Sequence, residues 1–253
     1  MSSMQDHLSA ILGSNTLEEV WSLHTSKMTE FGFDRIVYGY TRFRTGSTLG
    51  DLQDALILTN HDPAYVEHFV GDGAYYQGPM VAWAAENVGA CSWSLMRDLA
   101  MSGKLSPGEL EVVALNQKLG VTAGYTVSFH DVSTRAKGAT GLTAKRGLTQ
   151  DDVDEVWKTH GVDLELANKI MHLKVTQLPH TTGQRRPLTA RQREVLEWVA
   201  DGKTIQDTAT IMGLNPATIE KHLRLARETL DVDTTAQAIL KASSQNQFFL
   251  IES

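Results

Sequence analysis

Side chains that can contact nucleic acid recur near the C-terminus at a helical spacing. Thr218, Lys221, Arg224 and Arg227 follow one another at intervals of three residues. Their hydroxyl, ammonium and guanidinium groups donate hydrogen bonds, and the three cations attract phosphate oxygens. On a helix that is held in place by one apolar side, these groups are free to reach phosphates or base edges. The pattern predicts a nucleic-acid contact carried by a single helix.

Capping residues define the helices that must position this surface. Thr189, Thr204 and Asn215 each precede a run with helical periodicity and can accept a hydrogen bond from the first helical turn. Gly202 and Gly213 are expected to end the first two helices, because glycine readily adopts the left-handed conformation found there. The sequence therefore predicts three short helices joined by tight turns.

The third of these helices has one apolar face, formed by Ile219, Leu223, Ala226 and Leu230. That spacing buries one side of the helix and leaves the opposite side without apolar bulk. Two helices joined by a turn of about four residues, with the second one basic, form a helix-turn-helix, whose second helix enters the major groove of DNA. The alternative is a small helical bundle whose outer face is only solvated.

This segment is similar to a known family. The stretches LTARQREVLEWVADGKT, GLNPATIEKHL and LDV closely resemble the C-terminal DNA-binding domain of LuxR-type transcription regulators, over residues 188–242. The resemblance implies that Thr204 and His222 also belong to the DNA-binding surface. It further implies a fourth helix, from Ala236 to Ala242, that helps two copies to form a homodimer, and it makes RNA polymerase a candidate partner.

The distribution of charge shapes what we expect of DNA binding. The chain has a formal net charge of −7, with 23 Lys or Arg against 30 Asp or Glu. Residues 176–253 hold 9 of each sign, so residues 1–175 hold 14 basic against 21 acidic side chains. A domain without net positive charge attracts DNA weakly. We therefore expect a monomer to bind promoter DNA poorly and two copies to bind adjacent half-sites.

The preceding part of the chain alternates helical and extended patterns. Runs rich in β-branched and aromatic residues predict strands at 35–43, 54–59, 88–93, 122–130 and 137–144. Helices are predicted at 6–12, 16–33 and 149–173, with two short ones in 62–87 and further helix in 95–119. We infer an α+β chain: an α/β/α sandwich with a five-stranded antiparallel sheet in residues 1–175, a linker at 176–187, and a small all-α four-helix helix-turn-helix domain at 188–253.

The first part also resembles a known family, the autoinducer-binding domain of LuxR-type quorum-sensing regulators, which holds an N-acyl homoserine lactone. The family's signature of Tyr, Trp, Tyr, Asp, Pro and a later Trp corresponds here to the stretches HDPAYVEHF, GPM and CSW. His61 takes the place of the first Tyr, Tyr65 of the Trp, Phe69 of the second Tyr and Gly78 of the Asp, whereas Pro79 and Trp93 are retained. The resemblance implies a small-molecule ligand at these positions and no other cofactor.

Gly78 is chemically the largest departure from the family. The Asp carboxylate accepts a hydrogen bond from the ligand's amide N–H, and a bond to a charged group contributes roughly 1.5–3 kcal/mol. Tyr65 and His61 still carry donors, and Thr126 or Ser128 on the fourth predicted strand can point into the same space. We expect an unusual acyl-homoserine lactone or a different small amphipathic ligand. The alternative is a collapsed pocket in a dimeric regulator that needs no ligand.

Other patterns speak against further classes of function. His61 and His68 lie near acidic residues, but at a spacing that fits no usual metal site. The sequence has no G-x-S-x-G nucleophile elbow and no phosphate-binding glycine loop, and its single Cys91 can form no disulfide within the chain. With no membrane-length apolar stretch and no signal peptide, we expect a cytoplasmic protein without enzyme activity. The remaining alternative is an enzyme or interaction module whose last residues only assemble subunits.

Overall fold

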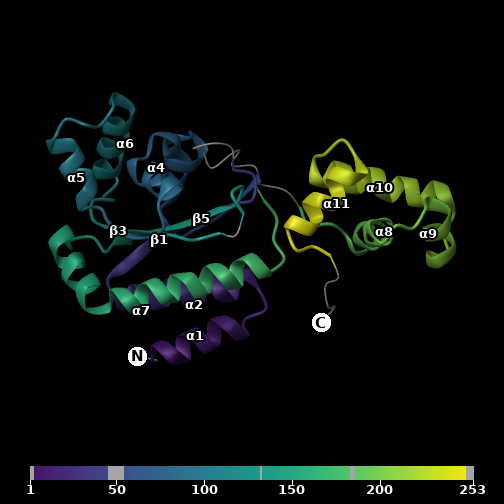
Figure 1. Cartoon of the computed structure of the whole chain (residues 1–253), viewed down its shortest axis with the longest axis horizontal. Coiled ribbons are helices and arrows are strands. Elements are labelled where there is room, and N and C mark those ends of the chain that lie inside the picture. Colours follow the sequence, from purple (N-terminus) through teal and green to yellow (C-terminus); the bar gives the residue numbers. More distant parts are fainter. Residues whose placement is uncertain (1–2, 45–53, 132, 183–185, 249–253) are drawn as a thin grey trace. The chain divides into compact units, whose positions relative to one another are not determined.

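The computed structural model describes residues 3–44, 54–131, 133–182 and 186–248 of the chain. The chain divides into two compact units, Met1–Thr176 and Gln177–Ser253, and each is described by itself. The first unit holds a sheet and the helices that cover it, whereas the described part of the second unit contains helices and no strand (Figure 1).

A five-stranded antiparallel sheet forms the centre of the first unit. Its strands are β1 (Phe33–Thr41), β2 (Ala55–Thr59), β3 (Gly89–Ser92), β4 (Gly124–Ser128) and β5 (Lys137–Ala144). They follow the order β2-β1-β5-β4-β3, and every neighbouring pair is antiparallel. The predicted sheet is confirmed, and its strand ends differ from the predicted ones by two residues at most.

Helices cover both faces of this sheet (Figure 1). One face carries α1 (Met4–Gly13), α2 (Leu17–Glu30) and the long helix α7 (Gln150–Gln177). The buried side of α7 includes Leu164 and Met171, and a hydrogen bond of 2.9 Å between Tyr38 Oη and His172 Nδ1 joins this helix to β1. The predicted sandwich is therefore confirmed.

Short elements cover the opposite face: α3 (Pro63–Val66), the π-helical turn η2 (Glu67–Gly71), the 3-10 turn η3 (Ala74–Gln77), α4 (Pro79–Glu86), α5 (Ser94–Met101) and α6 (Pro107–Lys118). Residues 62–87 contain the two short α-helices predicted there, α3 and α4, and also the two turns η2 and η3 between them. Pro63 and Pro79 each begin a helix, and Gly73 turns the chain between η2 and η3 at a φ of 77°. Because these residues begin and end helices at short intervals, every segment is short.

Among residues 186–248, the second unit contains four helices: α8 (Ala190–Ala200), α9 (Ile205–Met212), α10 (Pro216–Leu230) and α11 (Thr235–Ser244). The three predicted N-caps are present; for example, Asn215 Oδ1 accepts a hydrogen bond of 2.8 Å from the backbone N–H of Thr218. Gly213 has a φ of 66° and ends α9, as expected. The apolar side of α10 packs in one core with residues of the other three helices, and the helix-turn-helix arrangement is confirmed.

The linker expected at 176–187 includes residues 183–185, which lie outside the described residues, and the residues before them have structure of their own. Helix α7 continues through Gln177, and the following residues are fastened to the end of the second unit. The backbone N–H of His180 donates to the carbonyl of Gln245 at 3.0 Å, and Gln247 Nε2 donates to the carbonyl of His180 at 3.2 Å. Both glutamines are buried, so the carbonyl of Gln245 and the side-chain amide of Gln247 replace water as partners of this backbone. Part of the expected linker therefore belongs to the fold of the second unit.

Candidate ligand pocket and nucleic-acid interface

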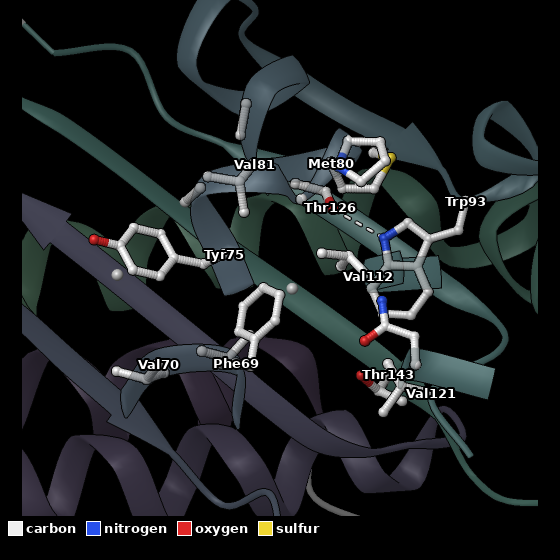
Figure 2. Close-up of a pocket in the computed structure, with 18 of the residues that line it drawn as sticks. Phe69, Val70, Tyr75, Met80, Val81, Trp93, Val112, Val121, Thr126 and Thr143 are labelled. Atoms are coloured by element: carbon white, nitrogen blue, oxygen red, sulfur yellow. Dashed lines mark hydrogen bonds between the residues drawn. The ribbon is translucent and has the colours of Figure 1, made fainter. Parts of the chain in front are cut away.

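A cavity of about 120 Å³ lies in the first unit between the sheet and the short elements that cover it (Figure 2). Its size is close to that of apolar protein cavities of about 150 Å³ that bind benzene. The lining is mostly apolar and comes from many separate segments. The lining includes Val37, Gly39, Tyr65, Phe69, Gly78, Trp93, Val112, Asn116, Thr126, Ala139, Gly141 and Thr143.

Small residues in the two central strands make room for this cavity. Across β1 and β5, Gly39 lies opposite Ala139, and Val37 lies opposite Gly141. A Cβ atom added at Gly141 would lie 3.2 Å from Val37 Cγ1. Because larger side chains at these positions would occupy the space above the sheet, the floor of the cavity depends on their absence.

Aromatic rings form one wall of the cavity. The ring of Tyr65 stacks between His61 and Phe69, with centroid distances of 4.3 and 5.0 Å. Tyr65 and Phe69 line the cavity, whereas His61 lies behind Tyr65 and is not among the lining residues. Burial raises the pKa of the Tyr65 phenol, so its hydroxyl stays protonated and can donate a hydrogen bond.

His61 supports the wall from behind. Its Nε2 atom lies 3.2 Å from Thr143 Oγ1, and Thr143 lines the cavity. Burial lowers the pKa of His61 to about 4, with a further contribution from the Arg35 guanidinium. His61 is therefore neutral at pH 7 and orients Thr143 and Tyr65 rather than presenting a charge to the cavity.

Trp93 and Thr126 are joined inside the cavity. Trp93 Nε1 donates to Thr126 Oγ1 at 2.9 Å, and both residues are buried (Figure 2). This bond occupies the one donor of the indole, while the Thr126 hydroxyl keeps its own hydrogen for a further bond. Thr126 therefore lies where the sequence predicts it, in the pocket with Trp93.

Ser128 lies on the same side of β4 as Thr126, but it is covered. Its Oγ atom lies within hydrogen-bond distance of the carbonyls of Ala84 and Asn87, at 2.8 and 2.7 Å, and the residue is fully buried. Both carbonyls belong to the C-terminal end of α4 and the residue after it. Ser128 therefore fastens α4 to the sheet and does not line the cavity.

Gly78 lines the cavity at the N-cap of α4. Its backbone has a φ of −74°, which any residue can adopt. A Cβ atom there would lie 3.1 Å from both the Tyr75 carbonyl oxygen and Val81 Cγ2. A larger side chain at this position would therefore have to displace these neighbouring atoms.

The second candidate site is the outer side of α10. Lys221 and Arg224 are exposed there, and Thr218 and His222 are half-buried beside them. Thr218 Oγ1 donates to Asn215 Oδ1 at 3.0 Å, which holds this side chain at the N-terminal end of the helix. The structure thus brings these four predicted residues onto one helix, with Thr218 in its first turn and Lys221, His222 and Arg224 along its middle.

The other predicted DNA contacts lie at the edges of this surface. Arg227 Nη1 donates to Thr235 Oγ1 at 3.3 Å, so its side chain is directed toward α11. Thr204 is the exposed N-cap of α9, and its Oγ1 atom is bonded to the Asp207 carboxylate at 2.6 Å. On α10 itself, Arg224 forms an ion pair of 2.6 Å with Glu228, and both side chains are more than half exposed. Such a pair costs little to open, because exposed ion pairs contribute about 0–1 kcal/mol.

Comparisons with known proteins cover both units. Residues 16–175 match the family described as "Autoinducer binding domain", and residues 186–242 match "Bacterial regulatory proteins, luxR family". This chain belongs to the LuxR-type family of quorum-sensing transcriptional regulators. It is 24% identical over 239 residues to the transcriptional activator protein AnoR of Acinetobacter nosocomialis, which covers 94% of this chain and 95% of AnoR.

Two further similarities extend the comparison. The transcriptional activator protein CarR of Pectobacterium carotovorum subsp. carotovorum is 22% identical over 201 residues, covering 76% of this chain and 80% of CarR. The solved structure of CepR2, an N-acylhomoserine lactone dependent LuxR family transcription factor from Burkholderia cenocepacia, has a TM-score of 0.50 at 18% identity. It covers 65% of this chain and 90% of CepR2 and supports the fold of a LuxR-type regulator.

This LuxR-type regulator has a pocket residue that the sequence reasoning missed. Asn116 lines the cavity from α6, one turn after the buried Val112. A polar residue on the apolar side of a predicted helix is a signal that the sequence does contain. Whether such a residue lines a pocket depends on which elements pack against α6, and the sequence pattern does not show this.

The described ranges contain neither a candidate metal site nor a candidate membrane span. They contain no group of three or more His, Cys, Asp or Glu side chains that could hold a metal ion. No helix in them is both long and apolar enough to span a bilayer. Cys91 is a free thiol whose pKa is raised by burial.

Proposed function

We propose that this LuxR-type regulator binds a small amphipathic molecule, an N-acyl homoserine lactone or a close relative of one, in the cavity of its first unit. The observation that carries the proposal is an open apolar cavity that presents a few polar atoms. Its apolar floor suits an acyl chain. Tyr65 and Thr126 suit a polar head group, Trp93 holds the Thr126 hydroxyl in place, and Phe69 and Gly78 shape the same space without a carboxylate. His61 and Ser128 hold the pocket from outside.

We further propose that α10 enters the major groove of promoter DNA. Lys221 and Arg224 are the exposed cations at the centre of its outer side, and Thr218 and His222 flank them. Thr204 and Arg227 contact the backbone at the edges, because α9 crosses the phosphates in a helix-turn-helix complex. These contacts position the helix, and the side chains that reach base edges select the sequence.

The functional form is proposed to be a homodimer. On α7, Val162, Leu166 and Leu173 are 85%, 42% and 54% exposed. Their spacing places them along one stripe of the helix, which is an apolar surface that a second copy can cover. Leu240 on α11 is 63% exposed and offers a smaller surface of the same kind in the second unit. Two copies of α10 would then read half-sites about 34 Å apart.

Ligand and DNA are linked through the population of the dimer. A ligand that binds the DNA-competent state more tightly than other states raises DNA affinity, and one that binds it less tightly lowers DNA affinity. We propose that the regulator acts in the cytoplasm, where promoter DNA is found. RNA polymerase, which is also found there, is a further candidate partner.

A ligand titration with a matched pair of variants tests the pocket. Thermal unfolding and tryptophan fluorescence are measured with lactones from butanoyl to dodecanoyl, since Trp93 lines the cavity. Ala139→Leu fills the cavity floor and should abolish the response. Ala114→Leu makes the same change at an exposed position of α6 and should leave it intact. No response of the wild type to any lactone would contradict the lactone proposal, and an equal response in both variants would contradict the placement of the site.

A further inference from the structure

Asn116 carries a buried side-chain oxygen for which the described residues provide no hydrogen-bond partner. It lies near the end of α6, and the buried Val112 one turn earlier lines the same cavity. Because residues four apart share a side of a helix, this side of α6 is directed into the pocket. An amide oxygen on the cavity side is therefore available to a ligand.

The position of Asn116 in the cavity follows from its neighbours. Its backbone carbonyl accepts a hydrogen bond of 2.8 Å from Val121, and Val121 packs in a cluster with Tyr65 and Trp93. In the view of Figure 2, Trp93, Val112 and Val121 are drawn to the right of Tyr75. Asn116 therefore belongs to the part of the pocket that also contains Trp93 and Tyr65.

Two other polar side chains of this region are already bonded to protein atoms. Thr126 accepts the N–H of Trp93, and Thr143 is bonded to His61. An unpaired buried amide oxygen is unfavourable and uncommon in folded proteins, whereas a leucine of similar size would carry no such penalty. A ligand that donates one hydrogen bond at this point would satisfy the oxygen.

Gly78 explains why such an acceptor is needed. The position offers no carboxylate, and a Cβ atom there would be crowded at 3.1 Å by the Tyr75 carbonyl and Val81. A ligand amide N–H therefore needs an acceptor from a different segment of the wall.

We propose that Asn116 is a specificity-determining residue whose Oδ1 atom accepts the hydrogen bond of the ligand's amide N–H. In this arrangement the polar contact comes from α6 and not from α4. The inference rests on the proposed function of the cavity.

A pair of probes that differ in one donor tests this contact. One is N-octanoyl-homoserine lactone, and the other is the ester in which an oxygen replaces the amide N–H. A neutral hydrogen bond corresponds to a preference of about 3- to 10-fold, so the wild type should prefer the amide by that factor. Asn116→Leu should bind the ester as the wild type does and lose the preference. Asn116→Asp, which keeps an acceptor, should retain it.

The outcomes separate this inference from the proposed function. If the wild type binds the lactone and Asn116→Leu keeps the full preference for the amide, the inference is wrong and the ligand pocket stands. If the wild type binds neither probe, the lactone proposal fails and the inference fails with it. The melting temperature of the ligand-free Asn116→Leu variant is a further check. We expect it to be unchanged or raised, and a large decrease would show that Asn116 is structural and would overturn the inference.

Discussion

The two units of this regulator carry their functional residues in opposite ways. In the second unit, exposed side chains on one helix, α10, form the surface proposed to contact DNA, while the core lies on the other side of that helix. In the first unit, the proposed ligand contacts come from separate strands and helices and are themselves part of a buried wall. Changes on α10 should therefore alter binding with little effect on stability, whereas changes in the pocket should alter both.

The largest expected effect comes from removing the two central cations of α10. Lys221→Ala combined with Arg224→Ala should weaken binding to a selected promoter duplex by at least about 100-fold, because charge-assisted bonds contribute about 1.5–3 kcal/mol each and a dimer loses them twice. The dependence of affinity on salt should become shallower, and dimerisation and melting temperature should not change. Binding is measured by fluorescence anisotropy over a range of salt concentrations.

Arg191→Ala is the matched control for this variant. Arg191 is an exposed arginine of α8 that forms an ion pair of 2.6 Å with Glu194, as Arg224 does with Glu228. The control should bind DNA within a few-fold of the wild type. Equal losses in the control and the α10 variant would show that overall charge, and not the position of α10, carries the binding.

The difference between a surface on one helix and a pocket formed by separate segments also determines what could be predicted from the sequence. The caps Thr204 and Asn215 and the apolar stripe of α10 are local patterns, so the helices and their exposed side followed from short stretches of sequence. Ser128 shows the limit of such reasoning. Its alternation with Thr126 placed it correctly on one side of β4, but the end of α4 covers it. Which element faces which residue is a long-range property, and that is also why Asn116 was missed.

Acid should destabilise the first unit through a buried histidine. His24 is fully buried, its Nε2 atom lies 3.2 Å from Asn168 Oδ1, and burial lowers its pKa to about 3. The unfolded chain therefore takes up a proton below its ordinary pKa of about 6.5, while the folded unit does not. Stability is complete above about pH 6.5 and is lost as the pH falls toward 3. At pH 5 the loss from His24 alone should be about 2 kcal/mol.

Urea unfolding at pH 7.5 and pH 5 measures this loss. Tryptophan fluorescence reports mainly on the first unit, which holds Trp21, Trp83, Trp93 and Trp157, whereas the second holds Trp198. His24→Gln keeps a donor for Asn168 and cannot titrate, so it should reduce the difference between the two pH values. An unchanged difference in this variant would show that other groups cause the acid sensitivity.

Gln247 tests whether the expected linker is fastened to the second unit. Its side chain bonds to the carbonyl of His180 and to the N–H of Leu188. Gln247→Ala leaves both groups without this partner and should destabilise the second unit by about 1–2 kcal/mol. Hydrogen exchange should rise at Leu188, whose N–H loses its acceptor. Gln206→Ala, at an exposed position of α9, is the control and should change neither quantity.

The smallest expected effect concerns the ion pair on α10. Glu228→Gln releases Arg224 and removes one negative charge from the outer side of the helix. DNA affinity should rise by a few-fold, while stability changes by less than about 1 kcal/mol, because the pair is exposed. Anisotropy and thermal unfolding of the same sample give both values. A fall in DNA affinity would show that Glu228 itself contributes to recognition.

Control of the DNA-binding unit by a ligand in the first unit is tested most directly by measuring DNA affinity with and without a lactone that the wild type binds. The wild type should change its affinity for a selected promoter duplex by at least about fivefold, in either direction, and DNA should change lactone affinity by the same factor. Ala139→Leu, with its filled cavity, should show no change. A wild type whose DNA affinity is the same with saturating lactone, or a cavity-filled variant that responds equally, would contradict this account.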